Sequence, residues 1–323
     1  MNKLPMIALT AAAVFAAAVT VLEIQPAVET QPVSQDVDDP AIWVHPKDPG
    51  RSLIVGTVKR PRPEGALAVY TLDGKLVETV GNLDRPNNVD ILGDICVATE
   101  RIERRLLVYR VHEASPHLRL IGTVPVFEGE AGEAGAPMGI ALYERNKDKA
   151  LFAIVSRKTG PREGYLWQYR LQVSGDKASG VRARAFGAFS GTGEIEAVAV
   201  DPERELVYYS DEDCCVRAYH ADPDHAQAGA EVARFGERGF GGNREGIAVA
   251  GAYVIVTDQL DPRSEYHLYR RSDWQEVAVW RGRSQSTDGI DAIARPMGPR
   301  FPRGFLVAMN NAAHNFHLYD MPD

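Results

Sequence analysis

Acidic side chains open several similar segments along this sequence. The segments read Asp39-Pro-Ala-Ile-Trp, Asn87-Asn-Val-Asp-Ile, Met138-Gly-Ile-Ala-Leu, Glu196-Ala-Val-Ala-Val, Glu245-Gly-Ile-Ala-Val and Asp288-Gly-Ile-Asp-Ala. Four of the six begin with a carboxylate, and Asp38 and Asp291 add to the set. Carboxylates that face one another raise each other's pKa unless a cation lies between them. Oxygen ligands in this number suit Ca²⁺, and the sequence has no local cluster of His and Cys that would favour zinc.

A second set of charged residues follows the strand-like run after each segment. In the first three copies these residues are largely basic, namely Lys59 and Arg60, Glu100 and Arg101, and Arg157 and Lys158. In the last three they are acidic or amides, namely Asp211, Glu212 and Asp213, Asp258 and Gln259, and Asn310 and Asn311. Any one of them could be a turn residue or a solvated strand end. Their repetition favours one pocket, in which metal ions on the acidic half face cations that bind phosphate.

The overall charge limits the class of ligand. A net charge of -8 argues against nucleic-acid binding, which usually needs a basic face. Bound cations would allow an acidic protein to hold a small anionic ligand. The 323 residues, 45% of them hydrophobic, have the composition of an ordinary globular protein. This length admits either two domains or one large all-β domain.

A repeated tyrosine indicates the elements that position these residues. The copies are Tyr70, Tyr109, Tyr169, Tyr219, Tyr269 and Tyr319, and the last four are spaced by fifty residues. A repeat of this length without a helical period is typical of propeller blades. One copy offers four strands, at 246–249, 253–257, 266–269 and 276–280. The sequence therefore predicts an all-β, six-bladed propeller with these tyrosines in its core.

The last copy offers only three strands, at 289–293, 305–308 and 316–319. The segment 27–33 could supply the fourth strand and close the ring, which would remove exposed sheet edges. The alternative is that this segment is a disordered linker. We expect closure, and a single propeller domain over residues 25–323.

The N-terminus has the layout of a secretory signal. One lysine lies within 1–5, an apolar run rich in alanine covers 6–22, and polar sequence begins at Glu23. The alternative is a retained anchor, for which the run is short. We assign 1–24 to a signal peptide and expect a secreted or periplasmic monomer without stable membrane association. The adjacent Cys214 and Cys215 would form a strained ring, so we expect no structural disulfide.

Several motifs together resemble those of the bacterial β-propeller phytases, which are calcium-dependent phosphatases that act on inositol hexakisphosphate. The resemblance covers about 27–320 as judged by motif order and spacing. Its motifs are Glu29-Thr-Gln-Pro-Val, Asp38-Asp-Pro-Ala-Ile-Trp, Asn87-Asn-Val-Asp-Ile, Ile195-Glu-Ala-Val-Ala-Val-Asp, Asp211-Glu-Asp, Arg244-Glu-Gly and Thr287-Asp-Gly-Ile-Asp. Each motif alone is weak, but the set is specific.

The resemblance implies roles for individual residues. Structural calcium ligands would be Glu29, Asp39, Asp288, Asn315 and the Val89 carbonyl. Ligands of the catalytic ions would be Glu196, Glu212 and Glu245, and Asp38 and Asp211 complete the expected metal set. Phosphate would be bound by Lys59, Arg60, Arg101 and Lys158, with Asn87 nearby. Met138 and Asn243 stand where a tyrosine and an aspartate are expected, which predicts weaker binding of at least one calcium ion.

We therefore expect a calcium-dependent 3-phytase, which releases phosphate from phytate by attack of a water activated by several metal ions. The sequence has no Gly-x-Ser-x-Gly elbow and no Cys/His pair that would suggest a covalent nucleophile. Two other classes stay open. One is a calcium-dependent propeller lactonase, which would need no basic half. The other is a propeller that binds phosphate ligands without catalysis.

Overall fold

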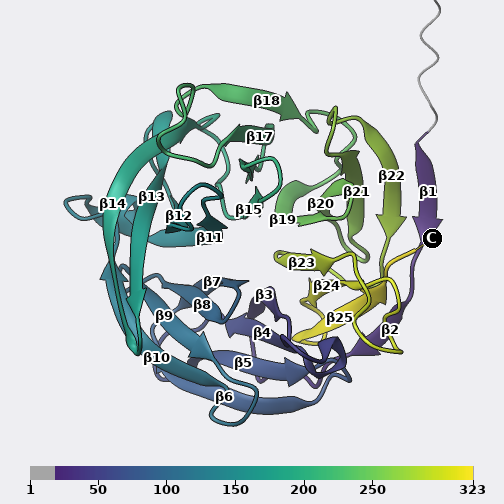
Figure 1. The fold of residues 1–323 in the computed structure, drawn as a ribbon. Helices are drawn as coiled ribbons and strands as arrows, with labels where there is room; N and C mark the ends of the chain where they lie inside the picture. Colours follow the sequence, from purple (N-terminus) through teal and green to yellow (C-terminus); the bar gives the residue numbers. More distant parts are fainter. Residues whose placement is uncertain (1–18, 323) are drawn as a thin grey trace, which may run out of the picture.

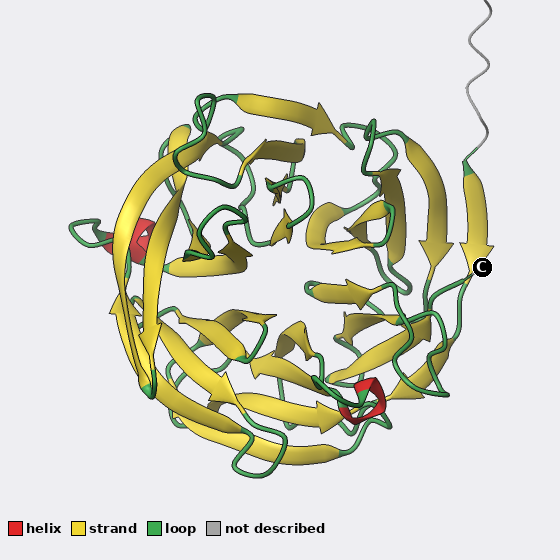
Figure 2. Cartoon of the chain, in the orientation of Figure 1, coloured by secondary structure: helices red, strands yellow, loops and turns green. Residues whose placement is uncertain are grey.

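The structure is a computed structural model that describes residues 19–322. Six β-sheets are arranged as blades in a ring around a central axis (Figure 1). Within the described residues, helix is confined to two single turns, η1 (Pro49–Arg51) and η2 (Gly132–Gly135) (Figure 2). The predicted all-β, six-bladed propeller is confirmed.

Each blade runs outward from the axis, with its first strand innermost (Figure 1). Blade one contains β3 (Val37–Trp43), β4 (Leu53–Val58), β5 (Gly65–Thr71) and β6 (Leu76–Leu83). Blade two contains β7 (Pro86–Leu92), β8 (Ile95–Glu100), β9 (Arg105–Val111) and β10 (Leu118–Pro125). Blade three contains β11 (Pro137–Glu144), β12 (Leu151–Arg157), β13 (Glu163–Ser174) and β14 (Lys177–Ala188).

The second half of the ring follows the same order. Blade four contains β15 (Val198–Asp201), β16 (Leu206–Asp211), β17 (Cys215–His220) and β18 (Glu231–Phe235). Blade five contains β19 (Asn243–Ala250), β20 (Tyr253–Gln259), β21 (Glu265–Arg270) and β22 (Glu276–Arg281). Blade six contains β23 (Ile290–Ile293), β24 (Phe305–Asn310), β25 (Asn315–Asp320) and β2 (Pro26–Glu29).

Six apolar clusters fill the spaces between neighbouring blades, so the core lies between sheets rather than at the axis. The repeated tyrosines are buried in these clusters, as the sequence predicted. Several of their hydroxyls accept a backbone N–H from the preceding blade. Tyr169 accepts from Phe127 at 2.7 Å, and Tyr319 accepts from Arg283 at 2.8 Å. The repeat therefore holds adjacent blades together as well as filling the core.

The N-terminal segment closes the ring, as predicted. Strand β2 pairs antiparallel with β25, the third strand of blade six, with Val28 opposite Leu318. The pairing continues beyond the strand, because the Thr30 N–H donates to the Phe316 carbonyl at 2.9 Å. The Asn315 side chain also donates to the Thr30 carbonyl at 3.1 Å. The first and last strands of the ring are thus joined by hydrogen bonds.

A further strand precedes β2. Strand β1 (Thr20–Glu23) lies parallel to β22 on the outer edge of blade five (Figure 1). Glu23 forms an ion pair with Arg263 at 3.0 Å. The boundary of the expected signal peptide at residue 24 stays a prediction, and its first eighteen residues lie outside the described part of the chain. Over residues 19–322, no helix has the length and hydropathy that crossing a membrane requires.

We predict that deletion of the N-terminus through Val33 lowers the melting temperature by at least about 10 °C, because it reopens blade six and leaves β25 as an unpaired edge. Deletion through Glu23, which keeps the buried Ile24, is the matched control. It removes β1, which only adds an outer strand, and should cost far less. Thermal unfolding followed by circular dichroism measures both. Equal melting temperatures for the two deletions would contradict closure by β2.

Candidate active site

A β-bulge near the start of several innermost strands determines which side chains lie at one end of the propeller axis. In blade one the pairing jumps from Val37 opposite Val58 to Pro40 opposite Gly56, which leaves Asp38 and Asp39 in a bulge. The same break occurs in β7, β11 and β19. It makes Asp38, not Asp39, the counterpart of Asn87, Met138 and Glu245. The position predicted for Asp39 in the acidic ring is therefore wrong by one residue: the register places Asp38 there, and the Asp39 carboxylate instead accepts the Val89 N–H of the next blade.

Hydroxyl groups of the second strands hold these bulges in place. Thr57 accepts the Asp39 N–H at 3.0 Å and donates to the Asn87 carbonyl of the next blade at 2.7 Å. Thr99 repeats the pattern, accepting from Asn88 at 3.0 Å and donating to the Met138 carbonyl at 2.7 Å. The bulges of blades one, two and three are thus fixed to one another, and the side chains on them have defined positions.

Carboxylates from four blades converge at this end of the axis. Asp38, Glu196, Glu245 and Asp288 line one cavity of about 10 Å³, which is close to the space that a single water-sized particle needs. Lys59 lies among them, with Nζ 2.6 Å from Asp38 Oδ1, 3.6 Å from Glu196 Oε1 and 3.7 Å from Asp288 Oδ2. One ammonium group thus faces four buried or half-buried acids.

The acids perturb one another strongly. Burial, followed by the neighbouring Glu212, Glu196 and Asp288, raises the pKa of Glu245 well above its usual value. Burial also raises the pKa of Asp38, although Lys59 opposes the shift. Burial alone would raise the pKa of Glu196, but Lys59 and the Asn87 amide bring it below the usual value. The cluster therefore lacks enough positive charge to ionise fully.

A second group of acids overlaps the first. Glu194, Glu196 and Glu212 each place an oxygen within 4.8 Å of the others. Burial, with Glu196 and Glu194 nearby, raises the pKa of Glu212 to about 8. Glu194 was absent from the residues that the sequence predicted. It lies on the loop before β15, outside the repeated segments, and its only signal was the spacing of two residues from Glu196.

The predicted cations border this cluster. Lys158 forms an ion pair with Glu194, and Arg101 Nη1 lies 3.4 Å from Asn87 Oδ1. The Asn87 amide in turn donates to Glu196 Oε1 at 2.5 Å. Arg60 lies farther out, where it pairs with Glu64 at 3.2 Å. The predicted residues Lys59, Asn87, Arg101, Lys158 and Glu196 are thus brought together.

A larger pocket of about 560 Å³ opens beside these cations. It is lined by Arg85, Arg101, Ile102, Arg104, Gly132, Glu133, Ala136 and Lys158. Burial lowers the pKa of Arg101, and the neighbouring Arg85 lowers it further. Arg85 and Arg104 were not predicted from the sequence, because both lie in turns outside the repeated positions. Four cations against one acid make this pocket suited to an anion.

Several predicted metal ligands lie elsewhere. Glu29 is 61% exposed on the outer strand β2, and its recorded partner is His317 at 4.0 Å. Asn315 is bonded to Asn310 and Thr30 in blade six. Asp39 accepts the Val89 N–H at 3.0 Å, so Val89 contacts the carboxylate through its nitrogen. The structure therefore does not join Glu29 and Asn315 to the central cluster, and a calcium site there stays a prediction.

Asp211 and Asp291 have structural partners instead. Asp211 accepts from Arg217 at 2.9 Å and from the Ser190 N–H at 2.8 Å. Asp291 accepts the Ile42 N–H of the neighbouring blade at 2.8 Å, and Asp90 accepts the Leu142 N–H in the same manner at 2.6 Å. Asp291 thus links blades rather than contributing to the acidic cluster.

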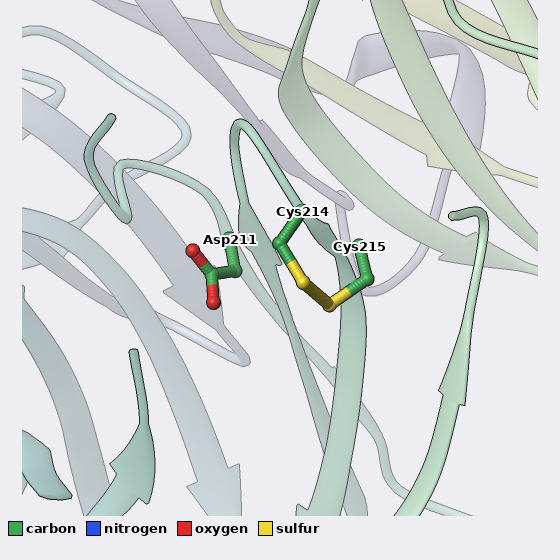
Figure 3. Close-up of side chains that lie close together, drawn as sticks. All are labelled: Asp211, Cys214 and Cys215. Atoms are coloured by element: carbon green, nitrogen blue, oxygen red, sulfur yellow. A yellow bond between two sulfur atoms is a disulfide. The ribbon is translucent and has the colours of Figure 1, made fainter. Parts of the chain in front are cut away.

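The turn that carries Glu212 ends in two bonded cysteines. Cys214 and Cys215 form a disulfide beside Asp211 (Figure 3). The expectation that they do not pair is therefore wrong, because the turn between β16 and β17 places the adjacent sulfur atoms together. A disulfide offers no thiolate to a metal, so this group does not provide the ligands of a zinc site.

The residues at the central cluster fit a hard cation. All of the acidic donors are oxygens, which Ca²⁺ prefers. Asp38 Oδ2 is buried without a hydrogen-bond partner among residues 19–322, although such an atom normally has one. Asp38, Glu196, Glu212, Glu245 and Asp288 are the residues that could hold the ion. Met138, at the ring position of blade three, is buried and adds no ionisable ligand, and Asn243 is exposed at the start of β19.

The fold and the site define a six-bladed propeller whose axis ends in clustered carboxylates bordered by Arg and Lys. A sequence model of the phytase family matches residues 3–316. The chain therefore belongs to the phytase family, and it is a phosphoric monoester hydrolase. A curated relative is the 3-phytase of Bacillus subtilis (strain 168), which is 28% identical over 87% of this chain and 77% of its own length.

One solved structure with a similar shape is the computationally designed Ika8 protein. It is 11% identical, with a TM-score of 0.48, over 91% of this chain and 74% of its own length.

We predict that the melting temperature falls as the pH rises from 6 to 8.5 when a chelator is present. Burial raises the folded-state pKa of Glu212 to about 8, of Asp90 to about 7 and of Asp291 to about 6. Carboxyls in the unfolded chain titrate near ~4, so protons bind the folded state more tightly. The resulting stability is present at low pH and is lost as the pH rises through these values. Calorimetry from pH 6 to 8.5 measures the melting temperature. A melting temperature that stays constant or rises over this range would contradict the raised pKa values of these buried acids.

Proposed function

We propose that this chain is a calcium-dependent 3-phytase, which releases phosphate from phytate (myo-inositol hexakisphosphate). The observation that carries the proposal is the contact between clustered oxygen ligands and phosphate-binding cations. Lys158 is paired with Glu194, and Glu194 lies within 4.8 Å of Glu196 and Glu212. Membership of the phytase family and the likeness to a 3-phytase support the choice of substrate.

Calcium ions bound by these carboxylates would supply positive charge that offsets the phosphate charge and activates a water molecule. The residues of the chain supply the rest. Lys158 and Arg101 lie where they can bind phosphoryl oxygens, and stabilising charge on these oxygens is the main contribution to catalysis of phosphoryl transfer. The attacking water forms a new P–O bond, the ester P–O bond breaks, and the ring oxygen leaves with a proton.

Asn87 and Lys59 have positioning roles. Asn87 contacts both Arg101 and Glu196, so it fixes a phosphate-binding group relative to a metal ligand. Lys59 is 14% exposed and is surrounded by Asp38, Glu196 and Asp288. Its charge therefore compensates the carboxylates first, and contact with phosphate comes second. Arg60, at the rim, would bind a peripheral phosphate group.

The Arg and Lys side chains of the pocket, with the oxygen ligands next to them, also argue against the two alternative functions, a lactonase and a propeller that only binds phosphate. A lactonase acting on a neutral ester has no use for a pocket lined by Arg85, Arg101, Arg104 and Lys158. A propeller that only binds phosphate would need the same cations but no cluster of oxygen ligands next to them. We infer further that the mature protein is a secreted or periplasmic monomer whose ligands are inositol phosphates, not nucleic acids.

We predict that purified protein releases phosphate from phytate when Ca²⁺ is present and loses this activity in a chelator. The melting temperature should fall under the same treatment, since ions that bind only the folded ring stabilise it. Phosphate release and thermal unfolding are measured on the same samples, before and after calcium is restored. A lactone substrate serves as the control for the alternative class. Unchanged phosphate release in chelator would exclude the calcium mechanism.

We predict that Lys158→Ala reduces phosphate release by about tenfold or more, because a charge-assisted contact to the phosphoryl group is lost. The side chain is 27% exposed, so the melting temperature should change little. Arg101→Ala should lose activity similarly, but Arg101 is buried and its loss should also lower the melting temperature. Steady-state kinetics on phytate test both variants. Full activity of both variants would favour the lactonase or the propeller that only binds phosphate over the proposed phytase.

A further inference from the structure

Glu194 is the acidic residue at the site that the repeat pattern does not explain. It lies on the loop between β14 and β15, and two hydrogen bonds tie its backbone to Glu212. The Glu194 N–H donates to Glu212 Oε2 at 3.0 Å, and the Glu212 N–H donates to the Glu194 carbonyl at 3.2 Å. These bonds hold the Glu194 backbone against a predicted metal ligand.

The side chain of Glu194 faces the acidic cluster. One of its oxygens lies within 4.8 Å of oxygens from Glu196 and Glu212, a separation that one bound cation can bridge. Glu196 also belongs to the cavity with Asp38, whose Oδ2 is buried without a hydrogen-bond partner among the described residues. Lys59 Nζ contacts both Asp38 and Glu196. The group around Glu194 is therefore continuous with the cavity that holds the orphaned oxygen.

Lys158 gives Glu194 a second possible role. Glu194 and Lys158 form an ion pair, with 25% and 27% of their side chains exposed. Glu194 could serve only to hold Lys158 at the phosphate pocket. A carboxylate whose only task is to hold a lysine does not need to approach two further carboxylates, since that proximity raises its free energy. A shared cation would remove this cost.

We propose that Glu194 is a further ligand of the active-site calcium, shared between the metal cluster and Lys158; this rests on the proposed function. Removing Glu194 and removing Lys158 should then affect calcium in opposite directions. Loss of Glu194 removes an oxygen ligand and a negative charge. Loss of Lys158 removes a competing positive charge next to the ion.

The test is calcium binding, measured by calorimetric titration of protein that has been freed of metal, together with the rise in melting temperature that calcium produces. Glu194→Gln, which keeps the size of the side chain, should bind at least one Ca²⁺ about tenfold more weakly and show a smaller rise. Lys158→Gln should bind calcium as tightly as the unmodified protein or more tightly, while it releases less phosphate. Glu194→Asp keeps the charge but shortens the reach, and it should also weaken binding.

The matched control is Glu144→Gln, which removes another glutamate paired with a lysine, Lys149, at 3.2 Å and away from the site. It should bind calcium like the unmodified protein. If Glu194→Gln and Glu194→Asp bind calcium normally but release less phosphate, Glu194 only positions Lys158 and the proposal is overturned. If the unmodified protein binds no calcium, the proposed function itself fails, and the inference fails with it. The unmodified protein therefore separates the two cases.

Discussion

Repulsion among carboxylates at one end of the propeller axis is the constraint on which the site depends. Asp38, Glu196, Glu245 and Asp288 come from separate blades, and among residues 19–322 the cation that pairs with three of them is Lys59. One ammonium group cannot neutralise four acids, so the folded chain retains either protons or bound cations there. This excess of negative over positive charge makes the protonation of the site depend on pH and makes the site suited to an ion with many oxygen ligands.

The fold converts this repulsion into defined geometry. A blade offers one side chain at each bulge, and the ring brings these side chains to the same height on the axis. The hydroxyls of Thr57 and Thr99 fix the bulges of blades one to three to one another, and Asp38 lies on the first of these bulges. Tyrosines such as Tyr169 and Tyr319 join the blades farther out. Rigidity at the axis is therefore supplied by contacts between blades.

The sequence predicted the repeated part of the molecule and failed where the repeat is broken. Six copies of one pattern specified the blades, their closure by β2, and the meeting of Glu196, Glu245 and Lys59. The error at Asp39 arose because two aspartates are adjacent there, and only the strand register shows that Asp38 is the counterpart of Asn87. Glu194, Arg85 and Arg104 were missed because they lie on loops and turns that differ between blades. Asp211 as a metal ligand stays a prediction, and its partners Ser190 and Arg217 are recognisable only in three dimensions.

Closure by β2 also orders the events of folding. This strand is among the first segments of the chain to be synthesised, but its partner β25 is the last strand of the propeller. Strand β2 therefore cannot pair with β25 until the rest of the propeller has been synthesised, and contacts of such long sequence separation form slowly. A chain that is cut short has no β25 to complete the ring, and it exposes open sheet edges that favour aggregation. Ring closure thus distinguishes a complete propeller from an incomplete one.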